Sequence, residues 1–99
     1  MSKITILEND MLIIVNARRW HDRKFGNTYF AGEIVVGRDD GTLDRIILPI
    51  QYGYGDQYMT AAGKALTAAG YMPEGVWPRS YFFGRLIDFV SDVARKGDL

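Results

Sequence analysis

The residues best suited to chemistry gather in one short segment, residues 17–30, where basic and aromatic side chains are interleaved. Four of the chain's twelve lysines and arginines fall within the seven positions 18–24. A guanidinium group presents a planar fork of donors to phosphate or carboxylate groups, and an exposed aromatic ring offers a stacking surface to a nucleobase. The segment therefore predicts a site for anions and bases, whose expected members are Arg18, Trp20, Arg23 and Lys24.

The same charges also fit a solvated hairpin end that binds nothing. In that alternative Arg18 and Arg23 pair with Glu33 and Asp22, while Trp20 covers the open face of a sheet. Charged runs of this kind are often simply soluble surface. The sequence leaves both interpretations open.

His21 is the chain's single histidine and stands next to Asp22, a combination that could act as a general base. Adjacent residues of a strand point to opposite faces, so the two side chains would not meet. None of the serines stands in a nucleophile-elbow pattern. We therefore predict a protein without catalytic residues. The alternative is a small enzyme acting on nucleotides or nucleic acid, with His21 as acid or base and Arg18 or Arg19 steadying phosphate charge.

A segment rich in tyrosine and glycine, residues 52–58, leads into the helix expected next. Phosphate-binding loops occupy this position, but neither a third glycine nor a Gly-Lys-Ser/Thr sequence follows. Asp56 is expected to cap the helix and would bring its own negative charge. We expect the glycines to permit a tight turn, and we add Tyr52, Tyr54 and Tyr29 to the surface beside the basic segment.

Composition narrows the classes of function further. Ninety-nine residues, 47% hydrophobic and 24% charged, describe a single globular domain over residues 1–99, and a net charge of zero gives no general attraction to nucleic acid or acidic membranes. The absence of cysteine and the single histidine leave no metal site, and we expect no cofactor. Neither a membrane span nor a signal peptide is evident, so we expect a cytoplasmic protein.

The first half of the chain predicts a meander of strands, because short apolar, β-branched runs alternate with turn residues. These runs cover residues 4–7, 11–17, 28–36 and 43–51. A two-residue turn at Gly26 and Asn27 would set Trp20 opposite Glu33 and Ala17 opposite Val36. At the next turn, two residues at Asp40 and Gly41 would set Val36 opposite Arg45, whereas the three-residue bulged turn that we prefer would set Val36 opposite Ile46.

One face of this sheet should be buried. Its expected members are Ile13, Val15, Ala17, Phe30, Ile34, Val36, Ile46, Leu48 and Ile50. The other face is expected to carry Asn16, Arg18, Trp20, Tyr29, Glu33, Arg45 and Gln51. Pro49 lacks a backbone donor and predicts an edge or an irregularity there.

The second half changes to a helical period. Residues 56–69 place Met59, Ala62, Leu66 and Ala69 on one stripe and end at Gly70. Ser80 could cap a second helix whose stripe comprises Phe83, Leu86, Ile87, Val90 and Val93. The sequence thus predicts an α+β domain, a four-stranded antiparallel sheet with two helices packed on one face.

The second helix would carry more apolar surface than one sheet needs, since Phe82 and Phe89 widen its stripe. Trp77, in the irregular segment before it, could frame the same surface. We therefore predict a homodimer whose interface includes Trp77, Phe82 and Phe89.

Three motifs together suggest a family. Residues 17–20 (ARRW), 26–29 (GNTY) and 52–58 (YGYGDQY) resemble a group of small uncharacterised proteins of phages and related mobile elements, over roughly residues 11–73. Members of that group carry an aromatic residue after the tryptophan and a histidine after the tyrosine, where this chain has His21 and Phe30. The resemblance implies a phage or prophage origin and no mechanism.

These observations favour a non-enzymatic binding module. The resemblance makes it a phage accessory protein, for host takeover or anti-defence, that engages a host protein, a nucleic acid or a nucleotide. A structural component of a phage particle is a further alternative.

Overall fold

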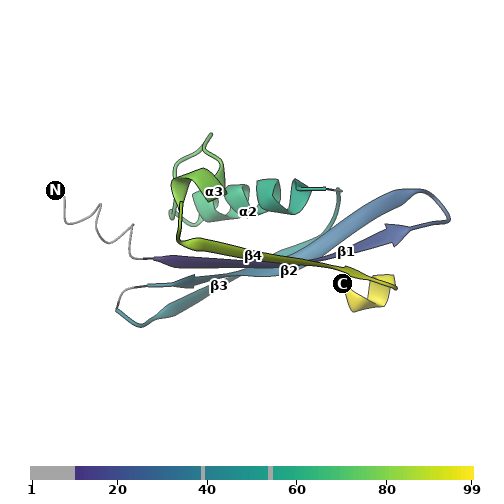
Figure 1. The fold of residues 1–99 in the computed structure, drawn as a ribbon, viewed down its shortest axis with the longest axis horizontal. Helices are drawn as coiled ribbons and strands as arrows, with labels where there is room; N and C mark the ends of the chain where they lie inside the picture. The colour runs from purple at the N-terminus through teal and green to yellow at the C-terminus, as the bar shows by residue number, and fades with distance from the viewer. Residues whose placement is uncertain (1–10, 39, 54) are drawn as a thin grey trace.

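The computed structural model describes residues 11–38, 40–53 and 55–99, which form a four-stranded sheet with helices on one face (Figure 1). The strands are β1 (Leu12–Asp22), β2 (Asn27–Gly37), β3 (Leu43–Tyr52) and β4 (Leu86–Val93), in the order β3-β2-β1-β4. Helices α2 (Gln57–Ala68) and α3 (Pro78–Tyr81) cover the sheet, and a short 3-10 turn, η1 (Lys96–Asp98), follows β4. The α+β class is confirmed.

The sheet is mixed rather than antiparallel, because β4 runs parallel to β1. The prediction of a long second helix was wrong: after the four residues of α3 the chain turns at Gly84, with φ of 77°, and becomes a strand. The run from Leu86 to Val93 is rich in β-branched and aromatic residues, and as a strand it pairs with the edge of β1 that β2 leaves open.

The first expected hairpin includes a strand that the structure does not describe. Residues 4–7 lie outside the described part of the chain. The strand that they were expected to pair with, β1, has β2 on one edge and β4 on the other. Pairing on both edges makes β1 a central strand, which accounts for its continuous burial of Ile13, Val15 and Ala17.

The pairing of β1 with β2 is shifted from the expected register. A four-residue loop, residues 23–26, replaces the two-residue turn, so Trp20 lies opposite Tyr29 instead of Glu33, and Ala17 lies opposite Gly32. Gly26, with φ of 73°, closes this loop through a hydrogen bond from its N–H to the carbonyl oxygen of Asp22. Because the shift is an even number of residues, every side chain keeps its predicted face.

The pairing of β2 with β3 is shifted in the same way. Val36 lies opposite Asp44 rather than Ile46, and the register slips between Phe30 and Gly32, beside the stretch of β3 that contains Pro49. Pro49 therefore lies on an edge strand next to an irregularity, as its missing donor predicts. Ile50, expected in the core, is 50% exposed because it falls at this slip.

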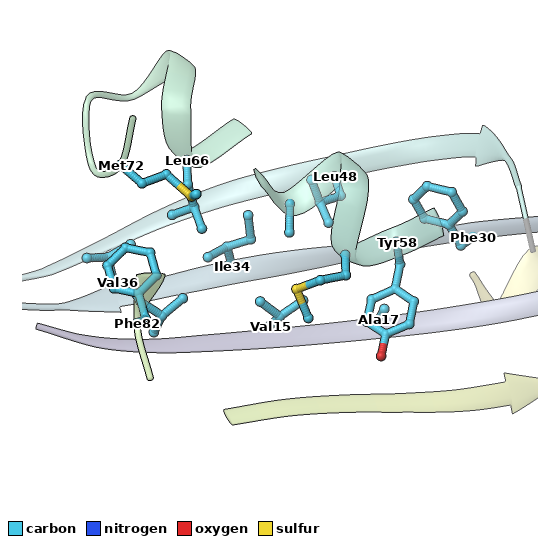
Figure 2. Close-up of a cluster of buried hydrophobic side chains, with 13 residues drawn as sticks. Val15, Ala17, Phe30, Ile34, Val36, Leu48, Tyr58, Leu66, Met72 and Phe82 are labelled. Carbon is cyan, nitrogen blue, oxygen red and sulfur yellow. The ribbon is translucent and has the colours of Figure 1, made fainter. Parts of the chain in front are cut away.

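The hydrophobic core lies between the sheet and the helices (Figure 2). Phe30, Ile34 and Leu48 of the sheet meet Tyr58 and the stripe of α2, as the sequence predicts for most of this face. In the expected stripe of α2, Met59, Ala62 and Leu66 are fully buried, whereas Ala69 is exposed because it lies after the last residue of the helix. Gly70 follows with φ of 87°. Figure 2 also places Phe82 among these side chains.

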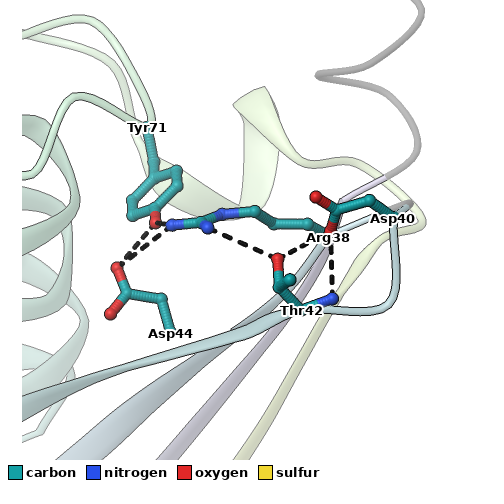
Figure 3. A network of polar contacts seen from close by, with 5 residues as sticks. All are labelled: Arg38, Asp40, Thr42, Asp44 and Tyr71. Atoms are coloured by element: carbon teal, nitrogen blue, oxygen red, sulfur yellow. Dashed lines mark hydrogen bonds and ion pairs between the residues drawn. The ribbon is translucent and has the colours of Figure 1, made fainter.

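A polar network fastens the β2–β3 turn to the segment after α2 (Figure 3). Arg38 donates to the hydroxyl oxygen of Tyr71, whose own hydroxyl donates to Asp44 at 2.6 Å. The hydroxyl of Thr42 donates to Asp40 at 2.6 Å and holds the pKa of that carboxyl below its ordinary value. These contacts fix the end of the sheet opposite the basic segment.

Candidate binding surface

Three aromatic rings stand in a row across the face of the sheet that the helices leave uncovered. The ring of Trp20 on β1 stacks beside that of Tyr29 on β2, with centroids 5.8 Å apart and planes 24° apart. Tyr29 meets Tyr52 on β3 edge to face, again at 5.8 Å. We call these three residues the aromatic row.

The register of the sheet creates the aromatic row. Trp20 pairs with Tyr29, and Tyr29 pairs with Tyr52, so the three side chains point to the same face. The neighbouring residues Ala17 and Phe30 point the other way into the core. Tyr52 is 61% exposed, whereas Trp20 and Tyr29 are half-buried, so the row is most accessible at Tyr52.

Basic residues lie at the same end of the sheet, and one of them lies on the same face. Arg18 precedes Trp20 by two residues on β1, opposite Ala31, and is therefore on the open face. Lys24, in the loop between β1 and β2, holds its ammonium 5.5 Å from the ring centre of Phe25, which is 69% exposed. The structure thus brings Arg18, Trp20, Tyr29 and Tyr52 together, while Tyr54 lies outside the described residues.

The ion pairs expected for a solvated hairpin end are not formed within the described residues. Glu33 pairs with Arg45 at 3.5 Å, and the carboxylate of Asp22 accepts the backbone N–H of Lys24 at 3.0 Å. Arg18 and Arg23 make no ion pair with another described residue. Their charges are therefore available to a ligand.

A pocket of about 710 Å³ opens behind the aromatic row, on the helix side of the sheet. Its wall includes Arg19, His21, Arg23, Thr28, Gly55 and Asp92. Arg19 bridges the wall, donating from Nε to Asp92 at 3.0 Å and from Nη1 to the carbonyl oxygen of Gly55 at 3.3 Å. Sequence reasoning missed Thr28 and Asp92 here, since β2 and β4 bring them to β1 from distant positions.

His21 lies in this pocket and is held by a hydroxyl group rather than a carboxylate. Its Nδ1 and the Oγ1 of Thr28, directly opposite on β2, share a hydrogen bond of 2.8 Å. Asp22 occupies the other face of β1 and bonds the loop instead. Among the described residues, no group of three or more His, Cys, Asp or Glu side chains could hold a metal ion.

The three residues expected at a dimer interface do not form one surface. Phe82 is 3% exposed and belongs to the core, because the turn after α3 directs it inward. Trp77 is the N-cap residue before α3 on the helix side, where it lines a second pocket together with α2. Phe89, which is 58% exposed, lies beside Asn16 on the uncovered face of the sheet.

Comparison with known proteins gives no family for this chain. No family model matches it, and no curated protein and no solved structure shows significant similarity to it. The phage family suggested by the three motifs stays a prediction. No helix in the described ranges is long and apolar enough to cross a membrane.

Proposed function

We propose that this protein is a non-enzymatic binding module for single-stranded nucleic acid, and that the aromatic row is its stacking platform. The observation that carries the proposal is the alignment of Trp20, Tyr29 and Tyr52 across three adjacent strands of an uncovered sheet face. Bases stack on exposed aromatic side chains, each contributing about 1–3 kcal/mol. Arg18 and Lys24 supply the positive charges that follow a phosphate backbone.

Single strands fit this surface better than duplexes do. The aromatic row offers ring surface, which only unpaired bases can use. Among the described elements, Figure 1 shows only the short turn η1 on the side of the sheet away from α2 and α3, and its three residues are too few to enter a groove as a recognition helix. A net charge of zero also disfavours a surface that depends on phosphate contacts alone. We therefore expect binding with a modest salt dependence.

The experiment measures the affinity of short single-stranded DNA and RNA oligonucleotides by tryptophan fluorescence. The chain has two tryptophans, so a Trp77→Phe background leaves Trp20 as the reporter. In that background Tyr52→Ala should weaken binding about tenfold, because it removes one stacking ring. Phe83→Ala is the matched control, because Phe83 is 88% exposed and follows α3, away from the aromatic row.

Two results would overturn the proposal. One is the absence of fluorescence quenching by either oligonucleotide at high concentration. The other is an equal decrease of affinity in Tyr52→Ala and Phe83→Ala, which would indicate non-specific contact. A small enzyme acting through His21 would instead be indicated by turnover of the oligonucleotide that His21→Ala abolishes. The phage accessory role, in host takeover or anti-defence, stays a prediction of the resemblance.

The other half of the uncovered face favours a second candidate role, self-association. It is apolar, and its members are Leu12, Ile14, Val35, Leu43, Ile47, Ile87 and Phe89. A soluble monomer seldom exposes so continuous a patch. We infer that a second copy of the chain covers this patch. Glu33 and Arg45, the charged residues within it, form an ion pair in one chain, and across a two-fold axis Glu33 of each copy can pair with Arg45 of the other. The aromatic rows would remain at the outer ends of such a dimer.

A further inference from the structure

The pocket behind the aromatic row lies at the end of the sheet that the helices leave free. In Figure 1 the β1–β2 hairpin extends well past the start of α2. Most of the residues that line the pocket belong to this end of the sheet, and strand alternation directs those of β1 and β4 next to Asp92 to the helix side. Arg19 and His21 reach it from β1, two residues apart on the same face, and Arg23 reaches it from the loop between the strands. Trp20 belongs both to the aromatic row and to the pocket wall.

The pocket carries an excess of positive charge. Two guanidinium groups, those of Arg19 and Arg23, face one carboxylate, that of Asp92. Arg19 uses Nε and Nη1 on Asp92 and Gly55, so its Nη2 retains donors for another acceptor. Arg23 makes no hydrogen bond or ion pair with another described residue. A ligand with several negative oxygens would therefore find donors from two directions.

His21 supplies a donor from a third direction. Its Nδ1 is engaged with the hydroxyl of Thr28 at 2.8 Å, which leaves Nε2 to the pocket. When the Thr28 hydroxyl donates to Nδ1, the neutral imidazole carries its proton on Nε2 and can donate it. The protonated ring donates from Nε2 as well. The Thr28 contact therefore orients His21 for an acceptor in either charge state.

We propose that this pocket binds a terminal phosphate group of the strand that stacks on the aromatic row. A phosphate monoester has three terminal oxygens and a charge close to −2 at neutral pH, which matches donors converging from Arg19, Arg23 and His21. A volume of about 710 Å³ exceeds that of one phosphate group and leaves room for the attached nucleotide. That the phosphate belongs to a nucleic-acid strand rests on the proposed function. That the pocket binds a phosphate group rests on the side chains that line it.

The first test compares one oligonucleotide in three forms: with a 5′ phosphate, with a 3′ phosphate and with neither, in the Trp77→Phe background. One of the phosphorylated forms should bind about tenfold more tightly than the bare form, as one or two charge-assisted hydrogen bonds would provide. Arg23→Gln should remove most of this ratio. Arg95→Gln is the matched control, since Arg95 pairs with Asp98 outside the pocket.

Asp92→Asn gives a change in the opposite direction. Removing the one carboxylate of the described wall relieves its repulsion of a phosphate and releases Arg19, so the ratio should rise by a few fold. Asp92 is 77% exposed, so the fold should tolerate the change. Asp98→Asn serves as its control. A ratio that falls in Asp92→Asn would overturn the assignment of this pocket.

A second readout needs no nucleic acid. The imidazole of His21 gives the only histidine NMR signals of the chain, and inorganic phosphate should shift them in a saturable way that Arg23→Gln weakens. If the three oligonucleotides bind equally and phosphate leaves His21 unshifted, the pocket proposal fails while the proposed function stands. If no oligonucleotide binds but phosphate shifts His21, the proposed function fails and the phosphate site is supported.

Discussion

The phenolic hydroxyl of Tyr58 donates to Oδ2 of Asp88 at 2.7 Å and so joins the first turn of α2 to β4. Arg79, on α3, donates to the same carboxylate oxygen at 2.7 Å and to the Tyr58 oxygen at 3.1 Å. Asp88 can make these contacts because it shares the helix side of the sheet with Val15, its partner on β1. Three elements that the sequence separates are therefore fastened at one point beside the core.

Tyr58→Phe tests this contact through its dependence on alkaline pH. Burial, followed by the hydrogen bond to Asp88, raises the pKa of Tyr58 to about 12 from an ordinary value of 10.0. Between these values the unfolded chain loses a proton that the folded protein keeps, so stability falls as pH rises. We expect Tyr58→Phe to lose about 1 kcal/mol at neutral pH and to show a shallower alkaline decline. Urea denaturation over a pH series measures both; an unchanged alkaline slope would contradict the assignment.

Asp88→Asn tests the same point at acid pH. The hydrogen bond from Arg79 is the main cause that holds the pKa of Asp88 below its ordinary 3.8. The stabilisation is complete above that ordinary value and is lost as pH falls through the lower, folded value. Asp88→Asn should lower the free energy of unfolding at pH 7 by about 1–2 kcal/mol, a modest loss because the pair is partly exposed. It should also flatten the decline of stability below pH 4, because the titrating carboxyl is gone. Urea denaturation over an acid pH series measures both effects. The control Asp98→Asn should have the same free energy of unfolding as the unaltered chain at pH 7.

Local signals in the sequence were sufficient for α2 and for the choice of faces in β1 and β2. The stripe of Met59 and Leu66 and the glycine after the helix act within a few residues, so they predict α2 without knowledge of the fold. Alternation in β1 survives a register error of even length, which is why Trp20 and Tyr29 were placed correctly on the open face although Trp20 was paired with Glu33.

β4 and the pocket depend on contacts between distant segments. The residues from Leu86 to Val93 satisfy both a helical and an extended pattern, and the choice is made by pairing with β1, about seventy residues earlier. The pocket in turn needs Asp92 from that strand. The spacing of Arg19 and His21 does place both side chains on one face of β1. Whether they line a pocket depends on where α2 begins, and the sequence spacing does not give that.

Gly32 marks a close approach between β1 and β2. A Cβ atom there would overlap the carbonyl oxygen of Asn16 and lie 2.8 Å from the Cα of Ala17, both backbone atoms of the central strand. Gly32→Ala should therefore cost about 2 kcal/mol or more. Gly37→Ala is the control on the same strand, because its Cβ would meet nothing nearer than 3.6 Å; its effect should stay within about 1 kcal/mol. Thermal denaturation of both variants measures the two losses of stability. Equal losses would show that β1 and β2 can move apart at Gly32 without a cost in stability.

Arg18 and Lys24 should contribute to nucleic-acid binding mainly through charge. Changing both to alanine should weaken oligonucleotide binding and reduce the slope of log affinity against log salt by about 0.7 for each phosphate that is no longer neutralised. The melting temperature should change little, since Lys24 is exposed and Arg18 lies on the uncovered face. Titrations at three salt concentrations measure the slope. An unchanged slope would return these residues to a solvated hairpin end.

Self-association should depend on Phe89 and not on Phe83, although both rings are more than half exposed. Phe89 lies within the apolar half of the uncovered face, whereas Phe83 follows α3 outside that face. Sedimentation equilibrium at tens of micromolar should give a dimer for the unaltered chain and for Phe83→Asp. Phe89→Asp should give a folded monomer, because a two-fold contact would bury two unpaired carboxylates. A monomeric unaltered chain would end the dimer proposal, and circular dichroism of Phe89→Asp distinguishes loss of association from loss of folding.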